Sequence, residues 1–203
     1  MAPFLVELVH HQQKAIMTNR ATTSFPILDV LAERWSPRAF DQSATLTMAD
    51  LGPAFEAARW SPSANNLQPW SFIVGFRGDE TFDAIVATLS GFNASWAPHA
   101  SALVVTITNT LTASGRQNVS ARYDLGQAVA HFSIQAQANG LSVHQMGGFD
   151  IETLTDSLGV NEPLEIVTVL AVGPAGDPAT LSDEMAEREL APRERKDVSE
   201  FVR

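Results

Sequence analysis

The strongest strand signal in the chain is Glu165-Ile166-Val167-Thr168-Val169-Leu170-Ala171-Val172, and the next is Ala102-Leu103-Val104-Val105-Thr106-Ile107. Both are short apolar runs rich in β-branched residues, a pattern typical of buried strands. Residues 71–76 form a further predicted strand, and residues 141–143 the start of another. Long helical stretches separate these strands, so the sequence predicts one sheet in an α/β or α+β fold.

Apolar residues recur at helical spacing in the segments between the predicted strands. One of these helices follows Thr47, a favourable N-cap residue, and the longest ends at Asn139-Gly140, a typical helix stop. The predicted helices cover residues 4–17, 26–33, 48–58, 79–89, 121–139, 151–158 and 182–190. No repeat, low-complexity tract or linker interrupts the pattern, so we expect residues 1–203 to form a single domain.

The composition excludes several kinds of function. The chain has 203 residues, of which 45% are hydrophobic and 18% charged, as is typical of a globular protein. It contains no cysteine, which removes disulfides, cysteine-ligated zinc, iron–sulfur clusters and thiol nucleophiles. Its formal charge of −10 disfavours nucleic-acid binding, which depends on a basic surface. No segment has the roughly 20 continuous apolar residues of a membrane span, and the N-terminus lacks a basic leader, so we expect a soluble cytoplasmic protein.

Two stretches concentrate arginine. In Arg34-Trp35-Ser36-Pro37-Arg38-Ala39-Phe40, two guanidinium groups and a hydroxyl could converge on one anion, and a phosphate monoester suits this donor set. The alternative, favoured by composition alone, is two surface arginines paired with Glu33 and Asp41. The second stretch, Arg193-Glu194-Arg195-Lys196, is by itself typical of a solvated charge run.

Two further segments combine polar groups with glycine or proline. Residues 59–70 form a polar, proline-broken loop whose Asn and Gln amides can both donate and accept, as reading the edge of a heterocycle requires. Met146-Gly147-Gly148-Phe149-Asp150 follows a predicted strand, and its paired glycines permit a close backbone approach. An ordinary loop and a plain turn explain the two segments equally well when each is taken alone.

Together these four segments resemble the FMN-dependent nitroreductase family, in the order in which the family has them. The family motif Arg-x-Ser-x-(Arg/Lys)-x-Phe is matched by Arg34, Ser36, Arg38 and Phe40. The motif Pro-Ser-Ser-x-Asn-x-Gln-Pro-Trp is matched by Pro62, Ser63, Asn66, Gln68, Pro69 and Trp70, with Ala64 in place of the second serine. Gly148-Phe149-Asp150 resembles a later signature, and Arg193 with Arg195 resembles a C-terminal pair of cations.

The resemblance implies a role for each matching residue. The FMN phosphate and ribityl end would be held by Arg34, Ser36, Arg38, Arg193 and Arg195. The ribityl chain and ring edge would lie along Pro62, Ser63, Asn66 and Gln68, and the segment Met146, Gly147 and Gly148 would offer backbone N–H groups near the flavin N5 and O4. Asn93 matches a further FMN contact, whereas Trp96 stands where some members have a lysine and could wall the pocket instead.

The resemblance also implies the fold and the activity. It implies an α+β, three-layer α-β-α fold, with a central, mainly antiparallel sheet flanked by helices, in an intertwined homodimer that holds FMN at its interface. The 121–139 helix would pack across that interface. The implied reaction is ping-pong: NAD(P)H gives hydride to the flavin N5 and leaves, and an electron-poor nitroaromatic, quinone or enone then takes it. The chemistry lies on the cofactor, so no catalytic side chain and no metal site are expected.

Several alternatives remain open at this level. Other members of the family carry out oxygen-dependent dehydrogenation or dehalogenation, and a flavin-binding protein without turnover would need the same residues. No Gly-x-Gly-x-x-Gly follows a predicted strand, which leaves NAD(P)H use open, since in this family nicotinamide stacks on the flavin itself. His144 could line the substrate pocket or be a structural histidine, and Arg116 and Arg122 are candidates to bind an NADPH 2′-phosphate.

Overall fold

A four-stranded antiparallel sheet forms the centre of the protein. The computed structural model describes residues 20–203, so the predicted helix over residues 4–17 lies outside the described residues. The strands follow the spatial order β1-β2-β4-β3, and each neighbouring pair is antiparallel. Their bounds are β1 Trp70–Phe76, β2 Ala102–Asn109, β3 Ser142–Met146 and β4 Leu164–Gly173.

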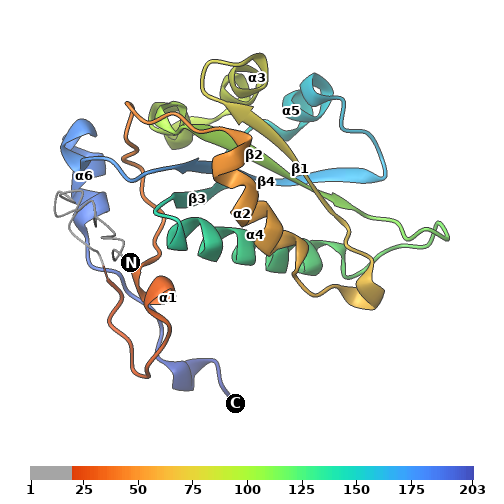
Figure 1. The fold of residues 1–203 in the computed structure, drawn as a ribbon, viewed down its shortest axis with the longest axis horizontal. Coiled ribbons are helices and arrows are strands. Elements are labelled where there is room, and N and C mark those ends of the chain that lie inside the picture. Colours follow the sequence, from red (N-terminus) through yellow and green to blue (C-terminus); the bar gives the residue numbers. More distant parts are fainter. Residues whose placement is uncertain (1–19) are drawn as a thin grey trace, which may run out of the picture.

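Helices cover both faces of this sheet, which makes three layers (Figure 1). One face carries α2 (Met48–Arg59) and α4 (Ala121–Ala138), which also pack against each other. The other face carries α3 (Glu80–Thr88) and α5 (Ile151–Leu158). The α+β, three-layer α-β-α fold and the antiparallel sheet expected from the sequence are therefore confirmed.

The two central strands are apolar at most positions because both of their faces are covered. Along β2, Leu103 and Val105 point into the core beneath α3 and α5, whereas Ala102 and Val104 point into the core beneath α2 and α4. Side chains alternate between the faces of a strand, so a strand packed on both sides needs apolar residues at every position. This explains why β2 and β4 are the clearest signals in the sequence.

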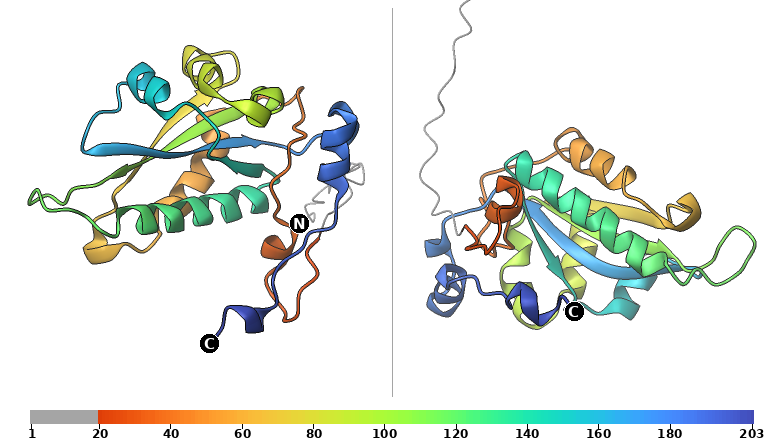
Figure 2. Two further views of the ribbon diagram at one scale, coloured as in Figure 1. Left: turned by 180° about the vertical axis from the view of Figure 1, so that it is seen from behind. Right: turned by 90° about the horizontal axis from the view of Figure 1, so that it is seen from below.

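Two chain segments leave the layered body and run together at one end of the sheet (Figures 1 and 2). The first contains α1 (Asp29–Glu33), and the second contains α6 (Asp183–Leu190) and the C-terminal residues. The sequence predicts a helix from residue 26, but the structure is helical only from Asp29 because Leu28 is extended (ψ 139°). Phe25 and Leu28 are largely exposed, so no packing supports an earlier helical turn.

The strand that the sequence predicts to start at residues 141–143 is β3. Its pairing with β4 begins at Ser142 and continues to Met146, which pairs with Val169. The strand therefore includes His144, which pairs with Ala171, and the two glycines follow directly after Met146. Within residues 20–203, no helix combines the length and apolarity needed to cross a membrane.

Candidate functional site

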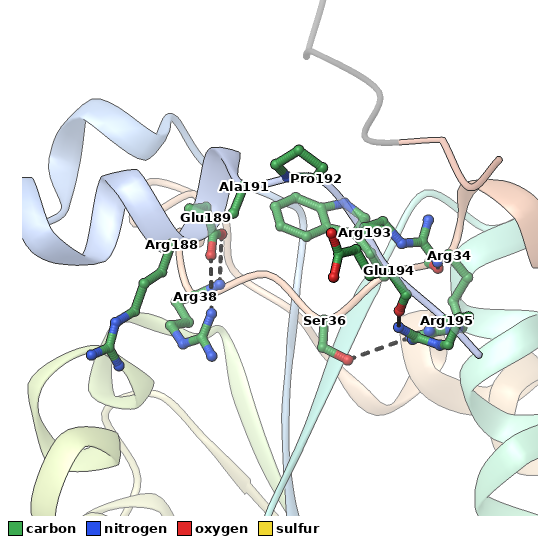
Figure 3. Close-up of a pocket in the computed structure, with 11 residues that line it drawn as sticks. Arg34, Ser36, Arg38, Arg188, Glu189, Ala191, Pro192, Arg193, Glu194 and Arg195 are labelled. Atoms are coloured by element: carbon green, nitrogen blue, oxygen red, sulfur yellow. Dashed lines mark hydrogen bonds and ion pairs between the residues drawn. The ribbon is translucent and has the colours of Figure 1, made fainter.

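Two arginine-bearing segments that are distant in the sequence form one pocket. Residues 34–38 lie against residues 188–195, and between them is a pocket of about 270 Å³. Figure 3 shows the side chains of both segments around it. The pocket is lined by Arg34, Trp35, Ser36, Arg38, Arg188, Glu189, Ala191, Pro192, Arg193, Glu194 and Arg195. We call it the arginine pocket; it contains all five residues to which the resemblance gives the phosphate end of FMN.

The positive charges of Arg34 and Arg195 in this pocket are not neutralised by ion pairs with carboxylates of the described residues. Burial lowers the pKa of Arg34, and the nearby Arg195 lowers it further. Burial also lowers the pKa of Arg193, followed by repulsion from Arg34 and Arg195. Among the described residues, no carboxylate forms an ion pair with Arg34 or Arg195. Guanidinium groups that repel one another create a favourable place for an anion with two negative charges.

Arg193 and Glu189 hold the backbone of the first segment in place. Arg193 donates from Nη1 to the carbonyl of Ala32 and from Nη2 to the carbonyl of Arg34, at 2.9 Å each. The buried Glu189 carboxylate accepts from the backbone N–H groups of Arg38 and Ala39, at 2.7 and 3.1 Å, and its second oxygen lies 3.6 Å from the Arg38 guanidinium. Arg193 is thus a clamp on the segment as well as a cation beside the anion site.

His144 supports this segment from strand β3. Its Nδ1 lies 2.9 Å from the carbonyl of Pro37 and so donates to it, while its ring packs on Trp96 at 4.4 Å between centroids. Burial lowers the pKa of His144 to about 4; its hydrogen bond with Pro37 opposes the shift, and Arg38 adds to it. The imidazole is therefore neutral near pH 7, which is the state required of a structural support beneath an arginine cluster.

The glycine segment after β3 lies beside the arginine pocket. The guanidinium groups of Arg38 and Arg188 lie over the Phe92 ring, at 5.6 and 5.2 Å from its centroid. The adjacent Asn93 donates from Nδ2 to the carbonyl of Gly148 at 3.1 Å. A Cβ at Gly148 would come within 2.7 Å of that same nitrogen, so a side chain at this position would displace the Asn93 amide. Within residues 20–203, the N–H groups of Gly147 and Gly148 donate no hydrogen bond, which leaves two adjacent backbone donors.

Three predicted contacts in this region take a different form in the structure. Met146 is buried in the core, so only its backbone is available to a ligand. Trp96 does not wall the pocket as expected; it is fully buried and stacks near Phe40, with a centroid distance of 6.2 Å. Asn93 uses its amide to fix the glycine segment, because its Nδ2 donates to the carbonyl of Gly148.

Residues 62–68, which we call the amide loop, form the remaining set of predicted contacts. Three of its residues, Asn65, Asn66 and Gln68, have positive φ angles of 51, 56 and 46°. The Gln68 N–H donates to Ser63 Oγ at 3.0 Å, and the buried Asp124 on α4 accepts from the Ala64 N–H at 3.0 Å. Such left-handed conformations cost energy in residues other than glycine and are concentrated at functional sites.

The amide loop and the arginine pocket are at opposite ends of the molecule. The loop follows α2 and lies at one end of the sheet, whereas α6 and the arginine pocket lie at the other, in all three views (Figures 1 and 2). Pro62, Ser63, Asn66 and Gln68 therefore do not meet Arg34, Ser36 and Arg38 within one chain. The structure brings together the arginine and glycine segments, and it leaves the amide loop apart from them.

Comparisons with known proteins place this arrangement in a family. The sequence model of the nitroreductase family matches residues 31–88, which include both the first arginine segment and the amide loop. A crystal structure of an oxidoreductase containing FMN superposes with a TM-score of 0.85 and 30% identity, covering 91% of this chain and 94% of that one. The chain belongs to the nitroreductase family.

The chain also has similar sequences among known proteins, one of which bears a nitroreductase name. This chain is 38% identical over 135 residues to an uncharacterized 15.4 kDa protein of Mycolicibacterium smegmatis. The alignment covers 61% of this chain and 88% of the relative. It is also 27% identical over 190 residues to YodC of Bacillus subtilis, whose name describes an NAD(P)H nitroreductase. That alignment covers 78% of this chain and 94% of YodC.

The structure corrects the alternative in which the arginines are surface ion pairs. Glu33 pairs with Arg20, and Asp41 accepts from Ser43, so neither carboxylate pairs with Arg34 or Arg38. The expectation that residues 193–196 are only a solvated charge run is also wrong, because Arg193 is bonded to two backbone carbonyls.

Glu189 is the site residue that sequence analysis missed. The sequence contains a pattern that could have revealed it. Leu181, Met185 and Glu189 follow one another at intervals of four residues, and the first two pack against the core. A carboxylate at the next position of an apolar stripe predicts a buried acid with a specific partner. In this nitroreductase-family protein, that partner is the backbone of the arginine segment.

Proposed function

We propose that this chain is an FMN-dependent oxidoreductase that uses NAD(P)H to reduce electron-poor acceptors in a ping-pong reaction. The observation that carries the proposal is the arginine pocket, in which residues 34–38 and 193–195 supply an excess of positive charge inside a protein of net charge −10. The similar crystal structure of an oxidoreductase contains FMN, and YodC bears the name of an NAD(P)H nitroreductase, which supports the same cofactor and donor here.

The residues of the arginine pocket fit the phosphate of FMN. Arg34 and Arg195 have no acidic partner among the described residues, so their guanidinium groups are available for charge-assisted bonds to a phosphate. Ser36 adds a hydroxyl 3.4 Å from Arg34 Nη1. Arg38 is partly neutralised by Glu189, so we assign most of the attraction to Arg34 and Arg195.

The glycine segment fits the ring of the cofactor. When bound, FMN supplies hydride chemistry, accepting a hydride from NAD(P)H and passing it to the second substrate. The unpaired N–H groups of Gly147 and Gly148 would face the edge of the ring and stabilise the negative charge that reduction places there. The Gly148 carbonyl is fixed by Ser90 and Asn93, which keeps these donors oriented before the cofactor arrives.

We propose further that the working form is a homodimer with FMN at the interface. The amide loop at the far end of one chain would then meet the arginine pocket of a second copy and provide Ser63, Asn66 and Gln68 to the same cofactor. Support comes from the terminal segments, where Phe25, Leu28, Phe201 and Val202 are each more than 60% exposed. Exposed apolar side chains gathered on projecting segments are typical of surfaces that a partner covers.

The first experiment is a visible absorption spectrum of the purified protein, followed by anaerobic addition of NADPH or NADH. We expect flavin bands that bleach with the nicotinamide and return when a quinone or nitroaromatic is added. Flavin bands that no nicotinamide bleaches would contradict the proposed donor. A colourless protein that takes up no added FMN would contradict the flavin site itself.

The second experiment separates phosphate binding from ring binding. Arg34→Ala should weaken FMN about a hundredfold, because a charge-assisted bond to a phosphate is lost, and should leave riboflavin affinity nearly unchanged, since riboflavin has no phosphate. The measurement is flavin fluorescence quenching on titration of the apoprotein. Arg59→Ala is a matched control, because Arg59 is exposed and pairs with Glu56 on α2. An equal loss for FMN and riboflavin would show that Arg34 does not bind the phosphate.

A further inference from the structure

A second pocket lies beside the amide loop. Its volume is about 260 Å³, and the loop and a hairpin between β2 and α4 form its walls. It is lined by Ala64, Asn65, Leu67, Thr112, Arg116, Gln117, Asn118, Val119 and Ser120. The wall residues Asn65 and Leu67 alternate with Asn66 and Gln68, so a molecule in this pocket is adjacent to the proposed flavin contacts.

The hairpin presents Arg116 in a fixed backbone geometry. Leu111 and Gln117 pair across it, and the Thr112 N–H donates to the Arg116 carbonyl at 2.8 Å. The turn closes at Gly115, whose φ of 76° suits glycine, and the Arg116 N–H donates back to Thr112 Oγ1 at 3.2 Å. These bonds fix the backbone from which the Arg116 side chain extends into the lining of the pocket.

The pocket contains a cation without an acid. The Nε of Arg116 donates to Ser114 Oγ at 3.2 Å, and no carboxylate of residues 20–203 forms an ion pair with this guanidinium. The other candidate, Arg122, is paired with Glu165 and does not line the pocket. In a chain of charge −10, an arginine with free donors among neutral amides and hydroxyls is a local site for an anion.

We propose that this pocket binds the 2′-phosphate of NADPH through Arg116 and so makes the enzyme prefer NADPH to NADH. The proposal rests on the proposed function, because it needs a flavin beside the amide loop. Sites for NADH commonly read the ribose 2′-hydroxyl with a carboxylate, whereas sites for NADPH use an arginine for the 2′-phosphate. The lining residues include an arginine and neither aspartate nor glutamate, which matches the second pattern.

The kinetic test compares both donors in the flavin-loaded protein. We expect wild type to have a higher kcat/KM for NADPH than for NADH. Arg116→Gln should lower kcat/KM for NADPH about ten- to hundredfold, the size expected when a charged hydrogen bond is lost, and should leave NADH unchanged. Arg116→Lys should retain part of the preference. Arg122→Gln is the matched control, since it removes the same charge six residues away and should leave the ratio unchanged.

A binding measurement tests the same pocket without turnover. Isothermal titration of the FMN-loaded protein should show adenosine 2′,5′-bisphosphate binding at least about tenfold more tightly than 5′-AMP, with the difference lost in Arg116→Gln. Inorganic phosphate serves as the third probe, and equal binding of phosphate and the bisphosphate would reduce the site to a general anion site and overturn the proposal.

The outcomes distinguish this inference from the proposed function. If neither donor reduces the flavin, the proposed function fails. If both donors reduce it equally well, or if Arg116→Gln slows NADPH and NADH by the same factor, the proposed function stands and the role of Arg116 is overturned.

Discussion

The arginine pocket and the amide loop are built in opposite ways. The arginine pocket joins segments about 160 residues apart in the sequence: the Arg193 guanidinium bonds the Arg34 carbonyl, and Glu189 bonds the Arg38 N–H. The amide loop is local, since the Gln68 N–H donates to Ser63 and the Gln68 side chain to the Asn66 carbonyl. One is a product of tertiary structure, and the other is a strained turn whose shape is set mainly by its own residues.

This difference gives the two regions different roles in one proposed site. The arginine pocket, assembled from two segments distant in the sequence, has all of its lining residues within a single copy. The amide loop is local, and it lies at the end of the sheet far from that pocket (Figure 2). The residues of the proposed cofactor site are thus divided between two surfaces of the chain, which the proposed second copy would bring together.

The largest expected effect comes from mixing two defective variants. Arg34→Glu damages the arginine pocket, and Asn66→Ala with Gln68→Ala damages the amide loop, so each homodimer should lose nearly all flavin reduction. Dissociation and reassociation of an equal mixture should restore about a quarter of the wild-type sites, because half of the dimers are mixed and each has one intact site.

The measurement is the rate of flavin reduction by NAD(P)H before and after mixing. Wild type carried through the same treatment gives the reference value. No recovery, with mixed dimers demonstrated by differently tagged chains, would mean that both regions act within one chain.

Removal of Glu189 should give the largest change in stability. Glu189→Ala leaves the N–H groups of Arg38 and Ala39 without their acceptor and the Arg38 charge without its partner, which should cost about 3 to 5 kcal/mol of unfolding free energy. Glu189→Gln keeps an acceptor and should cost less. Urea unfolding measures both, and Glu187→Ala, at an exposed position on the same helix, is the control. A cost below about 1 kcal/mol for the alanine variant would show that the carboxylate does not hold the segment.

His144 should give the arginine pocket a dependence on pH. Its pKa of about 4 in the folded state lies below the value near 6.5 of an unfolded chain, so protons bind preferentially to the unfolded state. Stability should therefore be highest above about pH 6.5 and should fall by at most about 3 kcal/mol as the pH drops toward 4. Urea unfolding from pH 7.5 to 4 measures this slope.

Two variants on strand β3 isolate the contribution of His144. His144→Asn keeps a side-chain donor near the Pro37 carbonyl but removes the titrating group, so the slope should decrease. Gln145→Ala, at the exposed neighbouring position, should leave the slope as in wild type. An unchanged slope in His144→Asn would assign the pH dependence to other groups.

The smallest expected effect tests the strain of the amide loop. Gln68 has a φ of 46°, which costs a side chain about 1 kcal/mol and costs glycine almost nothing. Gln68→Gly should therefore stabilise the fold by up to about 1 kcal/mol while weakening FMN. Leu67→Gly, at the neighbouring φ of −70°, should destabilise it instead. Urea midpoints compare the two, and destabilisation by both would mean that the loop is not strained.

The sequence by itself determined the layers and the motifs. Strands β2 and β4 are apolar at nearly every position because both faces are buried, and the helix at Ile151–Leu158 was predicted with the bounds that the structure has. The arginine, amide and glycine segments were also recognisable, since a local spacing of residues is written directly in the chain.

Only the tertiary structure decided what each of these segments contacts. No local pattern relates Arg193 to the carbonyl of Arg34, or Glu189 to the N–H of Arg38, because both contacts depend on how the chain returns after the last strand. The burial of Trp96 and the pairing of Arg122 with Glu165 likewise arise from packing between distant segments. Hydrogen bonds and ion pairs form between groups that are close in space, and the sequence specifies that closeness only through the whole fold.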